Sequence, residues 1–312
     1  MTESAPYFED VADAPAGGAA YWLRTKDGLR IRVVHWPLEG AKGTILMFPG
    51  RTEYAEKYGR AAKEYAARGY AMLAVDWRGQ GIADRMAEDR GLGHVGKFTD
   101  YQKDVDAVVD FVKEHDISGP HYLIAHSMGG CIGLRALHNG MPVKAAAFSA
   151  PMWGVDIAQP LKAAAWAIGT VGPKIGLKTM VSPGRSTTNY VEDQPFEGNE
   201  LTNDPVMYTY MNDQLKVHPE LGLGGPSVNW IGEALWEMDA LNKMESPNYP
   251  CFAGVGTAET IVDQDRVKDR MARWPRGEIA VYPDAKHEII IEVPEVRNDF
   301  FDRSVALFEA NS

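Results

Sequence analysis

Tyr122-Leu-Ile-Ala-His-Ser127-Met-Gly-Gly130 joins a short apolar run to a stretch of helical character. A serine between small residues at such a junction is typical of a nucleophile elbow, a tight strand-to-helix turn that lifts the hydroxyl above the sheet. The turn needs small residues two positions before and after the serine, because strand and helix pass close together there. Gly129 meets this need, and Ala125 departs from the usual glycine by one methyl group. Ser127 is therefore a candidate nucleophile if the chain also supplies a base, an acid and an oxyanion hole.

Other short apolar runs recur along the chain and alternate with helical stretches. Continuous apolar runs are typical of parallel strands that helices bury on both faces. The alternation predicts an α/β fold with a mostly parallel, doubly wound sheet, to which residues 21–36 add an edge hairpin. The predicted buried strands are 44–48, 71–75, 122–125, 145–148, 251–255 and 278–282, and the predicted helices are 52–68, 99–115, 128–139, 262–274 and 294–309.

The strand–helix alternation stops between residues 152 and 243. This segment is rich in Gly, Pro, Met, Trp and Tyr, and it contains several short helical patterns. It is too long to be a plain loop between two core strands. We therefore predict a core of residues 19–151 and 244–312, an inserted helical cap of residues 152–243, and a loose lead-in of residues 1–18.

Composition excludes several classes of protein. The 312 residues include 32 Lys and Arg against 43 Asp and Glu, a net charge of −11. Nucleic acid is not an expected partner, because basic side chains must neutralise its phosphates. Two cysteines, Cys131 and Cys251, build no disulfide framework, and the first residues lack the basic and apolar regions of a signal peptide. We expect a cytoplasmic protein without a transmembrane helix, with peripheral contact at the inner membrane surface left open and the oligomeric state unknown.

The serine needs a base and an acid. Among the eight histidines, His287 lies on the loop after the predicted strand 278–282, where this architecture places the base. The acid that orients such a histidine should follow the preceding core strand. Glu259 is the predicted acid, and Asp263 is the alternative, although an Asp at the start of a helical stretch also makes a natural N-cap. Serine, acid and base then follow one another in the chain order that this elbow type requires.

An oxyanion hole needs backbone N–H groups aimed at the oxygen on which negative charge develops. The first predicted donor is Met128, directly after the serine. The second is Arg51, because Gly50 permits a turn that directs the next N–H inward. A Gly-rich turn around Arg78 lacks the motifs of a nucleotide site, and we expect this arginine to pair with a carboxylate such as Glu53.

Together these motifs resemble the α/β-hydrolase superfamily, and more narrowly its branch of lysophospholipases and monoacylglycerol lipases. The resemblance spans nearly the whole chain from about residue 20. Three positions depart from the family pattern, since Pro49 stands where many relatives carry His, Ala125 replaces the first elbow glycine, and Glu259 stands where Asp is usual. The matching segments are 49–58, 76–82, 125–130, 259–263 and 285–288, with 201–205, 223–226 and Trp230 in the cap.

The resemblance implies a serine carboxylester hydrolase for single-acyl-chain lipid esters, either lysophospholipids or monoacylglycerols. It implies an acyl-enzyme and neither metal nor cofactor. Two alternatives stay open: a small-ester or C–C bond hydrolase of the same fold, and a ligand-sensing protein without turnover.

The cap should set specificity. Residues 157–190 contain four basic residues and no acidic one, and an apolar face recurs there at helical spacing. This pattern predicts a flap that meets a lipid surface or a phosphate head group, and a packed helix with solvated lysines is the alternative. The basic residues are Lys162, Lys174, Lys178 and Arg185, the apolar face is Leu161, Ala164, Ala165 and Ile168, and the predicted substrate contacts are Tyr54, Met152, Trp153, Trp166 and Met180.

Overall fold

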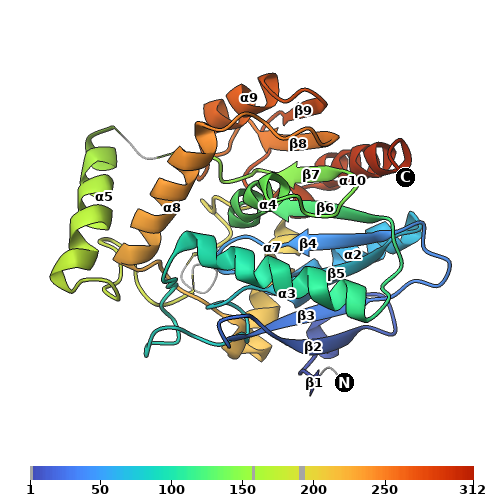
Figure 1. The fold of residues 1–312 in the computed structure, drawn as a ribbon, viewed down its shortest axis with the longest axis horizontal. Coiled ribbons are helices and arrows are strands. Elements are labelled where there is room, and N and C mark those ends of the chain that lie inside the picture. Colours follow the sequence, from blue (N-terminus) through green and yellow to red (C-terminus); the bar gives the residue numbers. More distant parts are fainter. Residues whose placement is uncertain (1–2, 157–158, 190–193) are drawn as a thin grey trace.

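A single sheet forms the centre of the computed structural model, which describes residues 3–156, 159–189 and 194–312. Within these residues nine strands pair in the order β1-β2-β3-β5-β4-β6-β7-β8-β9 (Figure 1). The first three strands of this order are antiparallel to their neighbours, and all later pairs are parallel. The strands are β1 (Glu3–Ser4), β2 (Ala19–Arg24), β3 (Arg30–Trp36), β4 (Thr44–Phe48), β5 (Ala71–Asp76), β6 (His121–His126), β7 (Ala146–Ser149), β8 (Cys251–Gly256) and β9 (Gly277–Tyr282).

Helices follow most of the strands, as the alternating pattern predicts. Short 3₁₀ helices, labelled η, precede or extend several of them. The elements are α1 (Glu9–Ala12), η1 (Ala55–Tyr58), α2 (Gly59–Ala67), η2 (Phe98–Asp100), α3 (Tyr101–Glu114), α4 (Met128–His138), α5 (Gln159–Val171), η3 (Gly172–Ile175), α7 (Pro205–Val217), η4 (Pro219–Leu221), α8 (Val228–Asn242), α9 (Gln264–Ala272), η5 (Ile289–Ile291) and α10 (Pro294–Glu309).

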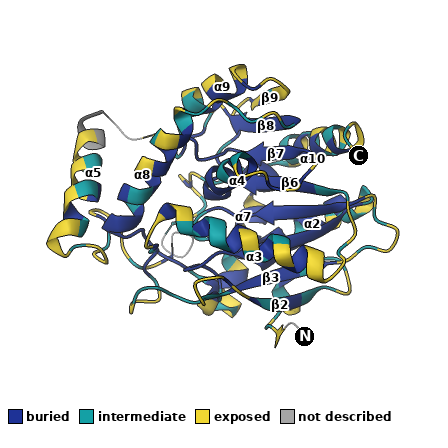
Figure 2. Ribbon diagram, viewed as in Figure 1, coloured by how far each residue is buried: buried dark blue, intermediate teal, exposed yellow. Residues whose placement is uncertain are grey.

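The sheet is covered on both faces. Helices α3 and α4 lie in front of it in Figure 1, and α2 and α10 lie behind it. Every residue of β4, β5, β7 and β8 is buried, which Figure 2 shows as a dark blue centre. Strands covered on both sides need apolar side chains on both faces, so the continuous apolar runs are explained. The predicted α/β fold with a mostly parallel sheet is confirmed.

The expected loose lead-in is ordered from residue 3 onward. Strand β1 pairs with β2, and Ala12 at the end of α1 is fully buried. The Tyr210 hydroxyl donates to the Ala12 carbonyl at 2.6 Å, and the Arg32 guanidinium donates to the Pro6 carbonyl at 2.9 Å. These partners are far away in the sequence, so a local pattern of small and acidic residues could not indicate the packing.

Two local predictions also differ from the structure. The helix expected from residue 52 begins at Ala55, because Thr52 has a φ of 70° and still belongs to the loop after β4. The Arg78 guanidinium pairs with Asp104 at 2.7 Å and with Asp27 at 2.9 Å, and not with Glu53. The carboxylate of Asp104 lies on α3, beside the turn that follows β5.

The described elements between β7 and β8 are helical (Figure 1). Helix α5 packs against α8, and the two backbones meet at Gly169 and Gly232. A Cβ on Gly169 would lie 2.5 Å from the Cα of Gly232, so this crossing requires glycine. No helix in the described ranges is long and apolar enough to cross a membrane.

Candidate active site

Three side chains that the sequence predicts to act together meet at the carboxyl ends of the parallel strands. The Ser127 hydroxyl donates to His287 Nε2 at 2.9 Å, and His287 Nδ1 donates to Glu259 Oε2 at 2.6 Å. Ser127 follows β6, Glu259 follows β8 and His287 follows β9. All three are buried. In this geometry the imidazole can accept the serine proton while the carboxylate fixes its tautomer.

The elbow around Ser127 is strained, and its neighbours explain how it forms. Ser127 has a φ of 49° and a ψ of −117°. A Cβ on Gly129 would clash with the Phe48 carbonyl of β4, so this position needs glycine. The extra methyl group of Ala125 faces Gly133 of α4, where a Cβ would lie only 3.3 Å from it. The absence of a side chain at Gly133 therefore provides the space that the usual elbow glycine would provide at position 125.

Glu259 is held as an acceptor by its own loop. Its Oε1 accepts the backbone N–H groups of Ile261 at 2.6 Å and Val262 at 3.1 Å, which leaves Oε2 for His287. Burial by itself raises the pKa of Glu259, but His287 and these N–H groups outweigh it and lower the pKa. The alternative acid, Asp263, instead caps α9 by accepting two backbone N–H groups of its first turn, both at 3.1 Å.

Two backbone segments carry the N–H groups expected for an oxyanion hole: the start of α4 and the loop after β4. Met128 begins α4, and the first N–H groups of a helix have no acceptor within it. In the part of the chain that the structure describes, no acceptor faces the Arg51 N–H. The neighbouring Gly50 is fixed, since its N–H donates to Glu53 and its carbonyl accepts Gln80 Nε2 at 2.9 Å.

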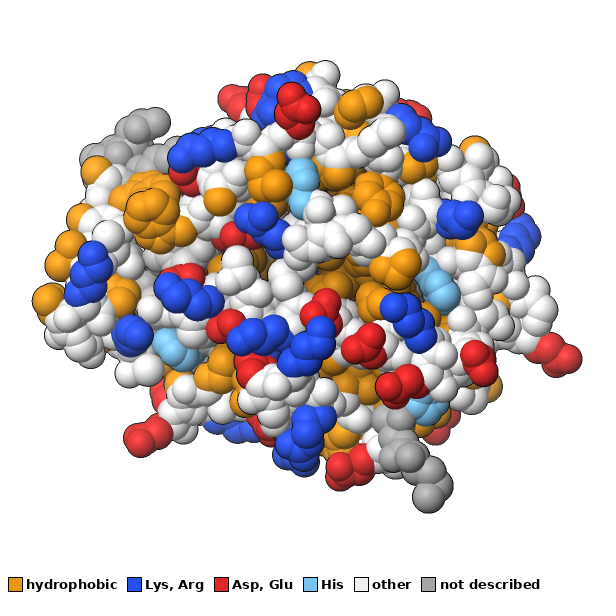
Figure 3. Space-filling view, in the orientation of Figure 1, with side chains coloured by type: hydrophobic (Ala, Val, Ile, Leu, Met, Phe, Trp, Pro, Cys, Tyr) orange, Lys and Arg blue, Asp and Glu red, His pale blue; other side chains and the backbone are white. Residues whose placement is uncertain are grey.

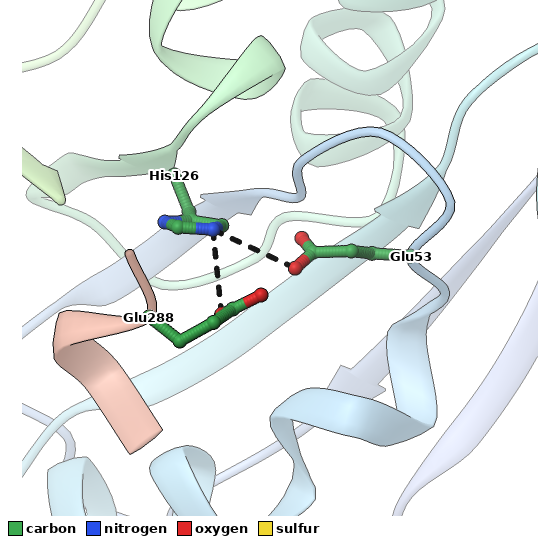
Figure 4. A group of neighbouring side chains, drawn as sticks. All are labelled: Glu53, His126 and Glu288. Atoms are coloured by element: carbon green, nitrogen blue, oxygen red, sulfur yellow. Dashed lines mark ion pairs between the residues drawn. The ribbon is translucent and has the colours of Figure 1, made fainter. Parts of the chain in front are cut away.

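Four buried ionisable side chains lie beside the triad. Figure 4 shows the carboxylates of Glu53 and Glu288 facing the ring of His126, with Nε2 at 3.7 Å and 3.3 Å from their oxygens. The Lys57 ammonium bonds both carboxylates, at 2.6 Å from Glu288 Oε1. On the other side of the ring, Nδ1 lies 3.0 Å from the Ser149 carbonyl. Both ring nitrogens therefore face acceptors, an arrangement that favours the protonated form of His126.

The pKa shifts agree with that charge state. Burial by itself lowers the pKa of His126, but Glu288 and Glu53 outweigh it and raise the pKa. The pKa of Glu288 falls well below its usual range, because His126 and Lys57 outweigh the opposing effect of burial. Two cations and two anions then make the cluster neutral. Glu53, His126 and Glu288 have the spacing of metal ligands, but Lys57 already supplies the positive charge that their carboxylates need.

This cluster connects the three loops that carry the site. Glu53 holds the loop of Gly50, His126 precedes Ser127, and Glu288 follows His287. His126 is buried, and its ring centre lies 4.8 Å from that of His287, so the cluster touches the histidine that bonds Ser127. Sequence reasoning missed the cluster, although the pair Glu53 and Lys57 at i,i+4 was a signal for it.

Replacing Lys57 with methionine is expected to lower the free energy of unfolding by about 3–5 kcal/mol, because two buried carboxylates would share one remaining cation. Lys42→Met is the matched control, since Lys42 pairs with Glu309 at an exposed site and should change stability by less than about 0.5 kcal/mol. Urea unfolding of both variants measures the difference. Equal effects of the two substitutions would contradict the structural role of the cluster.

The triad opens into a cavity of about 550 Å³. Its lining combines polar groups, among them Ser127, His287 and the loop after β4, with a larger number of apolar side chains, a mixture that is usual in small-molecule sites. Most of the apolar side chains come from α5, α7 and α8. These are Ala164, Ala165, Ile168, Met211, Leu215, Val228, Trp230, Ile231, Ala234, Leu235 and Met238, and Met152 adds to them.

The predicted substrate contacts divide into two groups. Tyr54 and Met152 line the cavity, but Trp153, Trp166 and Met180 do not. The Trp153 indole donates to the Gly130 carbonyl at 3.1 Å and so supports the elbow. The rings of Trp166 and Trp236 pack edge to face at 5.0 Å between α5 and α8. Met180 is exposed.

Part of the predicted apolar face of the cap helix contributes to the cavity. Ala164, Ala165 and Ile168 of α5 line it, as their spacing predicts. The side chains of Leu161 and Lys162 lie outside the described residues.

Comparisons with known proteins agree with this fold. Residues 39–294 match the Hydrolase_4 family, described as serine aminopeptidase, S33. The chain is 29% identical to lysophospholipase L2 of Escherichia coli (strain K12) over 302 residues, which cover 89% of this chain and 85% of that protein. It is 25% identical to the probable lysophospholipase L2 of Haemophilus influenzae over 303 residues, which cover 96% and 92% of the two chains.

A solved structure supports the same conclusion. A soluble variant of monoglyceride lipase from Saccharomyces cerevisiae, in complex with a substrate analog, superposes with a TM-score of 0.72 and 21% identity. The superposition covers 99% of this chain and 100% of that one, which shows the shared fold. With a family match over most of its length, the chain belongs to the Hydrolase_4 family of α/β-hydrolases.

Proposed function

We propose that this protein is a serine carboxylester hydrolase that cleaves single-acyl-chain lipid esters through an acyl-enzyme. The observation that carries the proposal is the hydrogen-bonded chain of Ser127, His287 and Glu259, whose serine and histidine line a largely apolar cavity. The names of the relatives, two lysophospholipases and a monoglyceride lipase, support a lipid ester as substrate.

Each residue of the site has a role in this reaction. Ser127 Oγ attacks the ester carbonyl carbon while His287 Nε2 takes its proton. The backbone N–H groups of Arg51 and Met128 stabilise the negative charge that develops on the carbonyl oxygen. His287 then gives the proton to the departing alcohol, and Glu259 stabilises the transient imidazolium. Water releases the fatty acid from the serine by the same steps.

The apolar side chains that line the cavity are suited to an acyl chain. We propose that residues 152–243 act as a cap, since α5, α7 and α8 of this segment supply most of the apolar lining. Burial of one methylene contributes about 0.8 kcal/mol, which corresponds to a factor of about four in kcat/KM. The cavity should therefore favour long chains over acetate or butyrate.

A substrate panel tests the proposed function. For p-nitrophenyl esters of increasing chain length, kcat/KM should rise by up to about fourfold per methylene until the cavity is filled. Lysophosphatidylcholine or monoacylglycerol should also be hydrolysed with multiple turnovers. A maximum at acetate would favour a small-ester hydrolase, cleavage of C–C bonds without ester turnover would favour a C–C hydrolase, and binding without turnover would favour a sensor.

We also propose that the cap makes transient contact with a membrane surface. Val171, Ile175, Met180 and Trp236 are exposed apolar side chains of this region. Lys174 lies between the first two in sequence, and Lys178 lies between Ile175 and Met180. Figure 3 shows hydrophobic and basic side chains gathered at the end of the molecule where α5 lies. Such a mixture suits an anionic lipid surface. The protein should hydrolyse a lipid ester faster in anionic vesicles than in zwitterionic vesicles. Equal rates of hydrolysis in the two kinds of vesicle would contradict the membrane contact.

A further inference from the structure

Two guanidinium groups on the cavity wall have no carboxylate partner among the described residues. Arg51 donates one hydrogen bond, to the Gly224 carbonyl at 2.8 Å, and lies 5.7 Å from the ring centre of Trp230. Arg185 also lines the cavity, and no ion pair of the described chain includes either arginine. By contrast, the buried Arg32 pairs with two carboxylates. With five N–H donors on each guanidinium, the two groups keep unused capacity for an acceptor.

The two arginines and one serine converge on the segment 224–226. Arg51 bonds the carbonyl of Gly224, and a Cβ on Gly225 would lie 2.7 Å from the Arg185 Cβ. The Ser182 N–H donates to the Pro226 carbonyl at 2.9 Å. Ser182 lines the cavity, is only 3% exposed, and its hydroxyl has no hydrogen-bond partner in the described part of the chain. This part of the wall therefore presents unused hydrogen-bond donors: those that remain on the Arg51 guanidinium, the guanidinium of the exposed Arg185 and the buried Ser182 hydroxyl.

The guanidinium groups of Arg51 and Arg185 lie close enough to repel each other. Burial lowers the pKa of Arg51 to about 10, and the nearby charge of Arg185 acts in the same direction. Arg51 nevertheless stays charged at neutral pH, and an anion between the two groups would relieve their repulsion. Four acidic residues of the described chain also line the cavity, and none pairs with either arginine. Glu53 and Glu288 bond Lys57, Glu200 accepts the Thr260 hydroxyl at 3.3 Å, and Asp156 is the fourth.

We propose that Arg51, Ser182 and Arg185 form an anion subsite that binds the phosphodiester of a lysophospholipid head group. The inference rests on the proposed function and narrows it from lipid esters in general to phospholipids with one acyl chain. Guanidinium groups suit this ligand, because their planar N–H pairs match two phosphate oxygens.

The reach of Arg51 fits such a substrate. In a 1-acyl lysophospholipid, six single bonds of about 1.5 Å separate the ester carbonyl carbon from phosphorus, a span of roughly 7 Å. Five bonds separate the Cα of Arg51 from its guanidinium carbon, so the side chain extends over a similar distance. One residue can thus place its N–H at the carbonyl oxygen and its guanidinium at the phosphate.

Specificity for the phosphodiester tests the subsite. The measured quantity is the ratio of kcat/KM for 1-oleoyl lysophosphatidylglycerol to that for 1-oleoylglycerol, which differ by the phosphoglycerol group. In wild type this ratio should exceed about 10, and Arg185→Met or Arg51→Met should lower it by about 10- to 100-fold, as expected for a lost charge-assisted hydrogen bond. Arg185→Lys should restore part of it. The backbone N–H of Arg51 is also a predicted oxyanion donor. For Arg51→Met, the ratio of the two kcat/KM values is therefore the readout, and not either kcat/KM value alone.

The control is Lys216→Met, which removes an exposed cation of α7 that does not line the cavity and should leave the ratio unchanged. A ratio that stays constant in both arginine variants, with both esters still hydrolysed, would overturn the subsite and leave the proposed function intact. A wild-type protein that hydrolyses neither ester would overturn the proposed function, and this inference with it.

A second arm distinguishes a head group from free phosphate. sn-Glycerol 3-phosphate should inhibit hydrolysis of p-nitrophenyl butyrate competitively in wild type, and at least tenfold more weakly in Arg185→Met. Inorganic phosphate should inhibit less than sn-glycerol 3-phosphate. Equal inhibition by the two anions would show a site for free phosphate, and would overturn its assignment to the lipid head group.

Discussion

Ser127→Ala should lower kcat for the hydrolysis of a long-chain p-nitrophenyl ester by about a million-fold, to the residual rate that binding and the oxyanion hole alone support. The expectation follows from the hydrogen bond between Ser127 Oγ and His287 Nε2, since alanine leaves the base nothing to activate. Stopped assays over several hours, on protein whose folding is checked by thermal unfolding, give the measurement.

The matched control for this variant is Ser149→Ala. Ser149 is fully buried and ends β7 beside the elbow; its hydroxyl lies 3.1 Å from His126 Nδ1 and has no bond to His287. Removal of the Ser149 hydroxyl should change kcat by less than about tenfold, because alanine keeps the Cβ and the packing around it. If Ser127→Ala kept more than one per cent of the wild-type kcat, the nucleophile would have to be another residue.

Glu259→Gln is expected to lower kcat by about 10⁴-fold with little change in the fold. An amide at this position can donate to Nδ1 and so favours the wrong tautomer of His287, and it does not stabilise the imidazolium that forms during attack. The carboxylate lies 2.6 Å from Nδ1 and its pKa is lowered, so wild type carries the negative charge at neutral pH. Steady-state kinetics at pH 7 would show the loss in kcat rather than in KM.

Asp263 provides the comparison for the acid. Asp263→Ala removes the N-cap of α9 and should lower the free energy of unfolding by about 1 kcal/mol, without a large effect on kcat. Should Asp263→Ala abolish activity while Glu259→Gln preserves it, the orienting acid would be Asp263. The two variants therefore separate a catalytic carboxylate from a helix cap four residues further along the same loop.

The hydrogen-bonded set of Ser127, His287 and Glu259 could be predicted because each member has a local signal. Ser127 lies in a short motif, and His287 and Glu259 follow recognisable buried strands in a fixed chain order. The parallel sheet was predictable for the same reason, since burial on both faces requires runs of apolar residues. The flaw at Ala125 could not be judged from the motif, because the compensating Gly133 lies on the facing helix.

The remaining features depend on contacts between distant segments. The cluster of Glu53, Lys57, His126 and Glu288 is assembled from the segments after β4, at the end of β6 and after β9, and no single segment reveals it. In the cap, size and apolarity could not tell whether a side chain faces the cavity or a neighbouring helix. The large Trp166 side chain packs on α8, whereas small residues of the same helix α5 line the cavity.

The central claim, that Ser127 is the nucleophile of an acyl-transfer site, is tested most directly by covalent labelling. A fluorophosphonate should react with the native protein at one equivalent per chain and abolish ester hydrolysis, and peptide mapping should place the phosphonyl group on Ser127. Labelling at another residue, or full hydrolytic activity in protein that carries the label on Ser127, would contradict the account.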